Sequence, residues 1–232
     1  MTDKPIVALI HGGFHGAWCW DLLVSELHRR GYRTSAVDLP IGELALGAAA
    51  YADVVAADLP EDEAIVVVGH SMGGLVVPPL AERRPVTHMV FLAALYPVPG
   101  KSMARQYEEE PEAVGAAYQH FRTREDGLLT LAPDPARQVI YHDCRADLAA
   151  WASSRIADQS PTIMGEVTPL RAWPEATTIS MAGVNDRCIP IGWQRATARR
   201  RFGIDPIELP SGHSPFLSCP AIVADALEHA LA

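Results

Sequence analysis

The 232-residue chain lacks several features that would place it in a membrane or outside the cell. No run of 18 uninterrupted apolar residues is present, although a membrane-spanning helix needs about that length. The first residues contain no basic segment followed by an apolar run and a cleavage site, so no signal peptide is expected. The four cysteines are widely spaced and form no Cys-x-x-Cys pair. We therefore expect a soluble cytoplasmic protein with reduced thiols.

Positive charge is also scarce, because 19 lysines and arginines stand against 28 aspartates and glutamates, for a net charge of −9. Such an acidic chain is a poor ligand for a nucleic-acid backbone or an anionic membrane, so neither is expected as a partner. Hydrophobic residues make up 49% and charged residues 20%, which excludes wholesale disorder. The length predicts one large domain, or one domain with an insertion.

Short apolar runs alternate with helix-like segments at both ends of the chain. Alternation of this kind predicts an α/β fold with a mostly parallel sheet flanked by helices. The expected strands are 6–10, 34–39, 65–68, 89–95, 177–182 and 206–209, and the expected helices are 21–30, 51–59, a helix after residue 74, 193–201 and 221–231. Pro78 and Pro79 fall inside the helix expected after residue 74, where proline should produce a kink.

The pattern changes between residues 101 and 173, which carry charged and aromatic helical segments and no clear strand. The helix-like pieces there are 104–107, 112–122, 135–142 and 146–157. We therefore predict a core made of residues 1–100 and 174–232, interrupted by a helical insert at 101–173.

The strongest chemical signal is Gly69-His70-Ser71-Met72-Gly73, which follows a β-branched strand and precedes a helix-like run. That context is typical of a nucleophile elbow. Glycines permit the sharp turn, which exposes the Ser71 hydroxyl at the carboxyl end of the strand. The amides at the start of the following helix can then stabilise an oxyanion. The alternative is a Gly-Ser turn without activity.

A serine nucleophile needs a base, and the base needs a third group to orient it. His213 is the only histidine downstream of Ser71 that lies in a loop directly after an expected strand. Asp186 lies in the loop after the strand at 177–182. Loops at the carboxyl ends of parallel strands converge on one edge of the sheet, so these residues are expected to meet there. Asp205 is a rival acid, and the alternatives are a turn-capping Asp186 and a surface His213.

The first expected strand ends at His11-Gly12-Gly13, where glycines let the backbone approach a substrate carbonyl. The amide of Gly13 is expected to pair with that of Met72 in an oxyanion hole. A plain tight turn is the alternative. His11 and His15 lie on a glycine-broken loop without a carboxylate cluster, so no metal site is expected.

Three segments carry a specific resemblance: His11-Gly12-Gly13-Phe14-His15-Gly16-Ala17-Trp18-Cys19-Trp20, Gly69-His70-Ser71-Met72-Gly73-Gly74 and Val90-Phe91-Leu92-Ala93-Ala94. They resemble the plant methylesterase, salicylate-binding and hydroxynitrile lyase branch of the α/β-hydrolases and its bacterial esterase relatives. The resemblance covers most of the chain and is weakest from residue 101 to 135. It implies an α/β-hydrolase fold with a small helical cap over an apolar pocket, usually a homodimer, and no cofactor. It also implies the triad Ser71, Asp186 and His213 and the oxyanion residues Gly13 and Met72.

The lyases of this branch need a threonine at the position of Gly12 and a lysine at that of Ser214, so both positions favour an esterase. We therefore expect a serine-triad carboxylic-ester hydrolase that acts on small, largely apolar esters through an acyl-enzyme. A lyase using the same site, or a ligand-binding protein on a hydrolase scaffold, is the alternative. Candidate pocket residues, each of which is also a candidate for the core, are Gly12, Phe14, Met103, Tyr118, Phe121, Trp151, Met164 and Ser214.

Overall fold

The computed structural model describes residues 4–232, and its centre is a six-stranded sheet in the order β2-β1-β3-β4-β7-β8. Every pairing in this sheet is parallel, as the strand–helix alternation predicts. The strands are β1 (Ile6–Ile10), β2 (Thr34–Ser35), β3 (Ile65–His70), β4 (Val86–Leu92), β7 (Thr177–Gly183) and β8 (Ile207–Leu209). All residues of β1 and β3 are buried, because helices cover both faces of the sheet.

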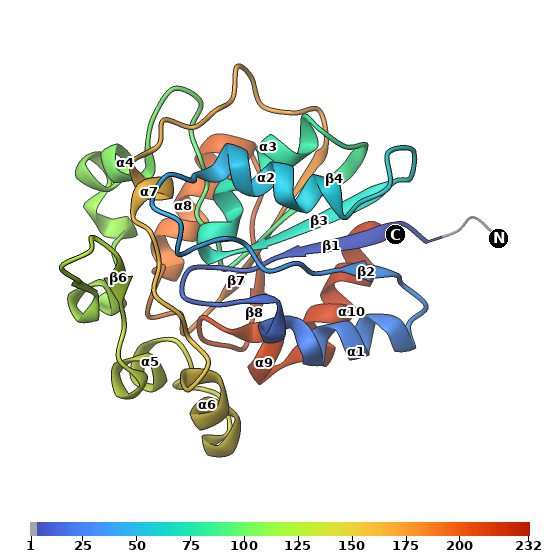
Figure 1. Cartoon of the computed structure of the whole chain (residues 1–232). Helices are drawn as coiled ribbons and strands as arrows, with labels where there is room; N and C mark the ends of the chain where they lie inside the picture. Colours follow the sequence, from blue (N-terminus) through green and yellow to red (C-terminus); the bar gives the residue numbers. More distant parts are fainter. Residues whose placement is uncertain (1–3) are drawn as a thin grey trace.

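Two groups of helices sandwich the sheet (Figure 1). The first group, α1 (Asp21–Arg29) and α10 (Pro220–Leu231), packs together on one face. The second group, α2 (Ala48–Ala57), α3 (Val77–Ala81) and α8 (Ile191–Phe202), covers the other face. This division follows from right-handed crossovers between parallel strands, since the chain moves one way from β1 to β2 and the opposite way afterwards.

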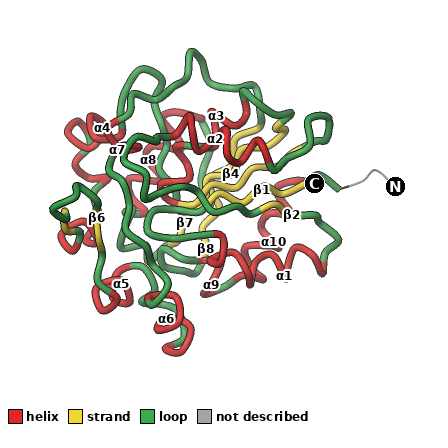
Figure 2. Tube along the Cα trace, viewed as in Figure 1, coloured by secondary structure: helices red, strands yellow, loops and turns green. Residues whose placement is uncertain are grey.

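The segment between β4 and β7 lies beyond the carboxyl ends of the central strands, at one end of the molecule (Figure 1). Loops and short helical pieces dominate it (Figure 2). Its elements are α4 (Met103–Glu109), η3 (Pro111–Ala113), η4 (Ala116–His120), β5 (Arg122–Thr123), β6 (Leu129–Thr130), α5 (Pro133–Val139), α6 (Ala146–Ser153) and α7 (Thr162–Gly165). The antiparallel β5–β6 pair and α7 are absent from the sequence-based expectation. None of the helices in residues 4–232 has the length and apolar character that crossing a membrane requires.

The segment after Ser71, in which a helix was expected from residue 74 on, is divided into two parts. A 3-10 helix, η2 (Ser71–Leu75), comes first, and α3 begins at Val77 with both prolines in its first turn. Amides in the first turn of a helix have no acceptor within the helix, so proline is tolerated there. Pro78 and Pro79 therefore start a helix, and the expectation that they kink one was wrong.

The expected strand at 34–39 is also shorter than predicted, because β2 covers only Thr34–Ser35. This strand lies at the edge of the sheet and pairs with β1 alone, through two residues. The remaining elements, η1 (Ala17–Trp20) and α9 (Pro215–Ser218), are short helical turns next to the sheet.

Candidate active site

Ser71 occupies a strained turn at the carboxyl end of β3. Its φ angle is +52°, in the left-handed region that non-glycine residues rarely adopt and that is often found at functional sites. A Cβ atom on Gly73 would lie 2.6 Å from the carbonyl oxygen of Ile10, so only glycine lets this turn pack against the end of β1. The expected elbow is therefore present in its local geometry.

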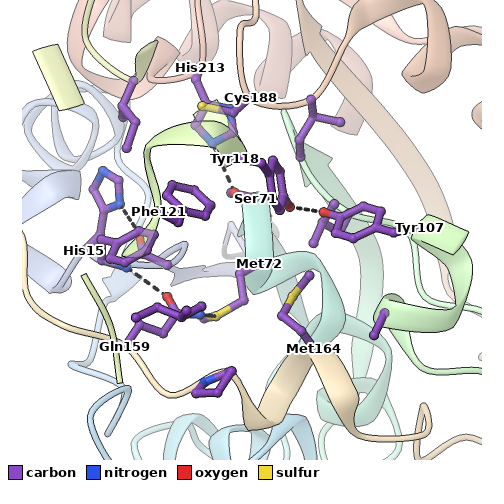
Figure 3. Close-up of a pocket in the computed structure, with 18 residues that line it drawn as sticks. His15, Ser71, Met72, Tyr107, Tyr118, Phe121, Gln159, Met164, Cys188 and His213 are labelled. Carbon is purple, nitrogen blue, oxygen red and sulfur yellow. Dashed lines mark hydrogen bonds between the residues drawn. The ribbon is translucent and has the colours of Figure 1, made fainter. Parts of the chain in front are cut away.

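Two further loops bring His213 and Asp186 to Ser71. The Ser71 Oγ and the His213 Nε2 are 3.0 Å apart, and Figure 3 shows this contact at the edge of a cavity. On the other side of the ring, the His213 Nδ1 donates to the Asp186 Oδ2 at 3.0 Å. In the neutral imidazole, Nδ1 therefore carries the proton, and Nε2 is the acceptor for the serine hydroxyl.

The Asp186 carboxylate is held firmly by its own loop and by α8. Its Oδ1 accepts the backbone amides of Cys188 at 2.7 Å and Ile189 at 3.0 Å, and Gln194 donates to Oδ2 at 3.4 Å. These bonds aim the carboxylate at the imidazole. The rival acid, Asp205, instead pairs with Arg199 on the exposed surface, away from His213.

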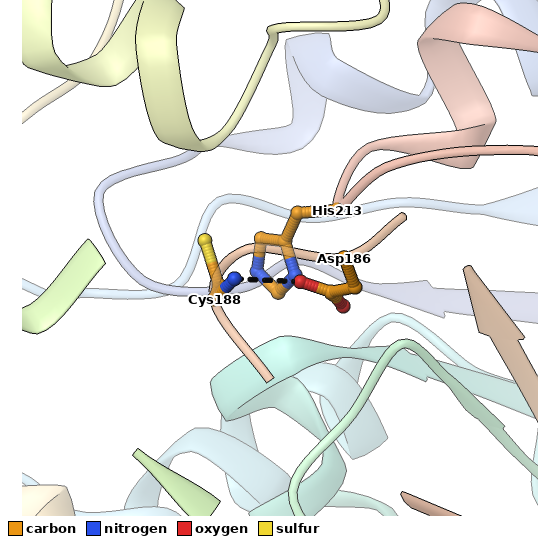
Figure 4. A group of neighbouring side chains, drawn as sticks. All are labelled: Asp186, Cys188 and His213. Atoms are coloured by element: carbon orange, nitrogen blue, oxygen red, sulfur yellow. Dashed lines mark hydrogen bonds and ion pairs between the residues drawn. The ribbon is translucent and has the colours of Figure 1, made fainter. Parts of the chain in front are cut away.

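The electrostatic state of His213 results from two opposing effects. Burial disfavours the charged ring, but the Asp186 carboxylate favours it, and the pKa of His213 is held well above its usual value. Figure 4 shows the Cys188 thiol beside this pair, and ligand atoms of the three side chains lie within 4.8 Å of one another. Burial raises the pKa of Cys188, so the thiol stays protonated at neutral pH. The Asp186 oxygens already accept two backbone amides and the imidazole N–H. These hydrogen bonds explain why the three side chains lie so close together.

The cavity next to Ser71 has a volume of about 340 Å³. Gly13 and Met72, the two residues expected to supply oxyanion amides, line it together with Ser71 and His213. Its other lining residues are Phe14, His15, Leu95, Ala104, Tyr107, Tyr118, Phe121, Leu129, Ile140, Gln159, Pro161, Met164, Cys188 and Ile189. None of these described residues carries a carboxylate, ammonium or guanidinium group, so the cavity suits an uncharged and largely apolar guest.

Four of the eight expected pocket residues therefore line the cavity: Phe14, Tyr118, Phe121 and Met164. Among those that do not, Met103 is almost fully buried and borders a separate, much smaller cavity next to α7. Trp151 borders an outer groove instead and meets Trp18 edge to face. The apolar character of these residues did not tell which of them face the serine.

Gly12 and Ser214 also lie outside the cavity lining. A Cβ on Gly12 would lie 2.7 Å from the His70 Nδ1 and 2.8 Å from the Ser71 Cβ, so this glycine is in tight contact and opens no space for substrate. Ser214 is fully buried, and its hydroxyl has no partner in the described chain. Both positions were expected at the site because the lyase relatives need a threonine and a lysine there, next to the site residues in sequence.

His11 and His15 form hydrogen bonds through both ring nitrogens. His15 donates from Nδ1 to the Gly13 carbonyl at 2.6 Å, and its Nε2 accepts the Tyr141 hydroxyl at 2.9 Å. His11 likewise donates from Nδ1 to the Gly12 carbonyl and accepts the Leu39 amide at Nε2. Burial lowers the pKa of His15 to about 3, so the ring is neutral and holds the loop after β1 in place.

Gln159 is a lining residue that sequence analysis did not identify. It comes from the stretch between α6 and α7, and its side chain contacts both the loop after β1 and Met72 (Figure 3). A lone glutamine in an irregular segment gives no periodic or motif signal, so only the folded structure identifies it.

Comparisons with known proteins were made on sequence and on structure. The profile of the Alpha/beta hydrolase family matches residues 7–226. The alpha/beta hydrolase nvfD of Aspergillus novofumigatus is 26% identical over 247 aligned residues, covering 98% of this chain and 96% of that protein. The probable esterase PIR7A of Oryza sativa is 40% identical over 113 residues, but the match spans only 43% of either protein. The structure of a pyrethroid hydrolase from Sphingobium faniae superposes with a TM-score of 0.82 at 24% identity, covering 97% of this chain and 96% of that one.

Proposed function

The chain belongs to the α/β-hydrolase family, and from this premise we propose that it is a serine-triad carboxylic-ester hydrolase. The observation that carries the proposal is the pair of hydrogen bonds that links Ser71 to His213 and His213 to Asp186, with Ser71 at the edge of an apolar cavity. Relatives named as an esterase and a pyrethroid hydrolase support the same chemistry.

The proposed reaction proceeds in two halves. The Ser71 Oγ attacks the ester carbonyl while the His213 Nε2 takes the hydroxyl proton, and Asp186 stabilises the imidazolium. The Gly13 and Met72 amides hold the negative oxygen of the tetrahedral intermediate. The C–O bond to the alcohol then breaks as His213 protonates the leaving oxygen. A water molecule activated by the same imidazole releases the acid and restores Ser71.

The substrate class follows from the cavity wall. A charged group would lose hydration there without meeting a lysine, arginine, aspartate or glutamate, so we propose uncharged esters with an apolar body. Residues 101–173 are proposed to act as the cap that encloses this body, with Phe121 and Met164 in contact with it. In this role the segment selects the substrate while the end of the sheet performs the chemistry.

The wider setting of the enzyme is proposed from the sequence. The four cysteines form no disulfide and the net charge of the chain is −9, and both fit a cytoplasmic enzyme. The absence of a cofactor is proposed from the family resemblance alone. The family resemblance suggests a homodimer. Sedimentation velocity tests the dimer, and a single species of about 25 kDa would exclude it.

The decisive experiment measures hydrolysis of p-nitrophenyl acetate and a panel of methyl, aryl and lactone esters by the purified chain. An organophosphonate should then give one covalent adduct, located on Ser71 by mass spectrometry. Ser154→Ala, a surface serine in the segment 101–173, is the matched control and should be labelled as the wild type is. Adduct formation elsewhere with Ser71 intact would overturn the assignment.

The lyase alternative is tested with the same protein preparation. Cyanohydrin cleavage releases cyanide and is expected to need a permanent cation nearby, and none of the described lining residues is a lysine or an arginine. The ratio of kcat/KM for mandelonitrile to that for a methyl ester should therefore lie far below one. Equal efficiency on the two substrates would favour the lyase.

A further inference from the structure

Gln159 reaches from the segment 101–173 into the loop after β1 and touches both proposed oxyanion residues. Its Oε1 accepts the Phe14 amide at 3.0 Å, and its Nε2 lies 3.0 Å from the Met72 sulfur. A Cβ on Gly13 would come within 2.2 Å of the same Oε1. The carboxamide thus fills the space that the absent Gly13 side chain leaves open.

The backbone of Gln159 is fixed independently of these contacts. It exchanges two hydrogen bonds with Leu129, at 2.9 and 2.7 Å, in an isolated antiparallel bridge. The residue is only 4% exposed, so its side chain cannot reach solvent without opening the cavity wall. The backbone of Gln159 is therefore fixed, so its side-chain oxygen can hold the loop after β1 in place.

Phe14 needs such support because its φ angle is +63°, in a region that costs a non-glycine residue energy. The peptide unit that joins Gly13 to Phe14 is held on both sides. His15 donates to its carbonyl oxygen at 2.6 Å, and its N–H donates to Gln159. The Phe14 carbonyl in turn accepts the Ala157 amide at 2.9 Å, from the same segment as Gln159.

These contacts divide the support of the loop between two parts of the molecule. His11 and His15, from the sheet side, hold the carbonyl groups of Gly12 and Gly13. The segment 101–173 holds the N–H and the carbonyl group of Phe14. If the Gln159 acceptor is lost, we expect the Gly13–Phe14 peptide to rotate and Phe14 to relax to a negative φ. Because Gly13 joins this peptide unit to the one that holds its own amide, the backbone at Gly13 is then no longer fixed.

We propose that Gln159 is a positioning residue of the oxyanion hole, through which the segment 101–173 fixes the direction of the Gly13 amide. This inference rests on the ester-hydrolase function proposed above. It makes that segment part of the machinery for transition-state stabilisation as well as a wall of the substrate cavity. An interaction that acts only on the transition state changes kcat and leaves ground-state binding almost unaffected.

The test compares Gln159→Met, which keeps the volume and removes the acceptor, with the matched control Thr162→Val. The Thr162 hydroxyl also ties this segment to the core, donating to the Leu44 carbonyl at 2.6 Å, but it does not line the cavity. We expect Gln159→Met to lower kcat about 10- to 100-fold, somewhat less than the loss of a whole oxyanion donor, with KM changed less than about threefold. Thr162→Val should leave both constants near wild type.

A second readout separates positioning from simple substrate contact. An aryl trifluoromethyl ketone adds to a serine nucleophile and places an oxyanion in the hole, whereas the matching aryl methyl carbinol binds as a ground-state analogue. For Gln159→Met, the Ki of the ketone should rise by the factor lost in kcat/KM, while the Ki of the carbinol stays within about threefold. Parallel losses for both inhibitors would make Gln159 a substrate contact and overturn the proposal.

Gly13→Ala supplies an independent route if Gln159→Met fails to fold, as judged by circular dichroism. Its methyl group should displace the Gln159 carboxamide and lower kcat, and the same change should cost clearly less in a Gln159→Ala background. Additive losses would overturn the proposal. If the wild type is active and Gln159→Met is unaffected, only this inference fails; if the wild type hydrolyses no ester, the proposed function fails and this inference with it.

Discussion

The catalytic cavity has two walls that are built in different ways. The sheet wall carries Ser71 and His213, with Asp186 behind the histidine, at the ends of three parallel strands, where hydrogen bonds hold each group in one orientation. The opposite wall comes from short helices and loops of residues 101–173 and presents mainly apolar side chains. The two walls differ because bond making needs fixed directions, whereas recognition of an apolar guest needs only shape and surface.

This comparison predicts that substitutions in the sheet wall act on rate and that most substitutions in the segment 101–173 act on substrate choice. Gln159 is the proposed exception, because it comes from the segment 101–173 but is proposed to position the oxyanion hole.

The largest effect is expected for Ser71→Ala. Removing the nucleophile should lower kcat by about 10⁴- to 10⁶-fold, because the oxyanion amides and the cavity give only residual catalysis. The melting temperature should stay close to that of the wild type, since the Ser71 hydroxyl faces the cavity and is not packed in the core. Steady-state ester hydrolysis and thermal unfolding measure the two effects, and residual activity above one per cent would contradict the assignment.

The next effect is expected for Asp186→Asn, which should lower kcat about 10³- to 10⁴-fold by losing control of the imidazole tautomer. The base must be neutral, so kcat/KM should rise with pH, and the raised pKa of His213 places this rise above the usual histidine range. Without the Asp186 charge that pKa falls, and the midpoint should move to lower pH. A full pH–rate profile measures both changes.

Asp205→Asn is the matched control for this experiment. Asp205 pairs with Arg199 on the surface, so its removal should leave both the rate and the midpoint in place. A greater loss for Asp205→Asn than for Asp186→Asn would show that the acid is misassigned.

A smaller effect is expected in the segment 101–173. Phe121 packs between Phe14 and Tyr118 with ring centroids 4.9 and 5.0 Å away, and Phe121→Ala should lower kcat/KM for an aryl ester about tenfold. Acetate esters, which fill less of the cavity, should be almost unaffected. Trp151→Ala is the control, because Trp151 lies outside the cavity, and equal losses for the two variants would contradict the assignment of this wall.

The smallest effect concerns Gly12→Thr, which tests whether this position shapes the substrate site. Because a Cβ would meet His70 and Ser71, we expect overpacking that costs about 1–3 kcal/mol and lowers the melting temperature by several degrees. Differential scanning fluorimetry measures the shift. An unchanged melting temperature together with new mandelonitrile cleavage would restore Gly12 as a specificity position.

The parts of the fold that could be predicted from sequence are those with a strong local signal. The β-branched run at 65–68 and the apolar run at 6–10 became β3 and β1, because buried central strands need such residues throughout. Edge strand β2 and the β5–β6 pair were misjudged, since two-residue ladders depend on the neighbouring chain more than on their own residues. The role of Pro78 and Pro79 was predicted wrongly, because the change from a 3-10 helix to an α-helix before them gives no signal in the hydrophobic pattern of the sequence.

The sequence by itself determined which residues meet at the proposed active site. A glycine-flanked serine after a buried strand, followed by an acid and a histidine after later strands, specifies loop ends that parallel strands bring to one edge. Only the tertiary structure decided which side chains of residues 101–173 face that edge. Their placement depends on packing between segments distant in sequence, as when Gln159 meets Phe14 across 145 positions, and no local pattern records such a contact.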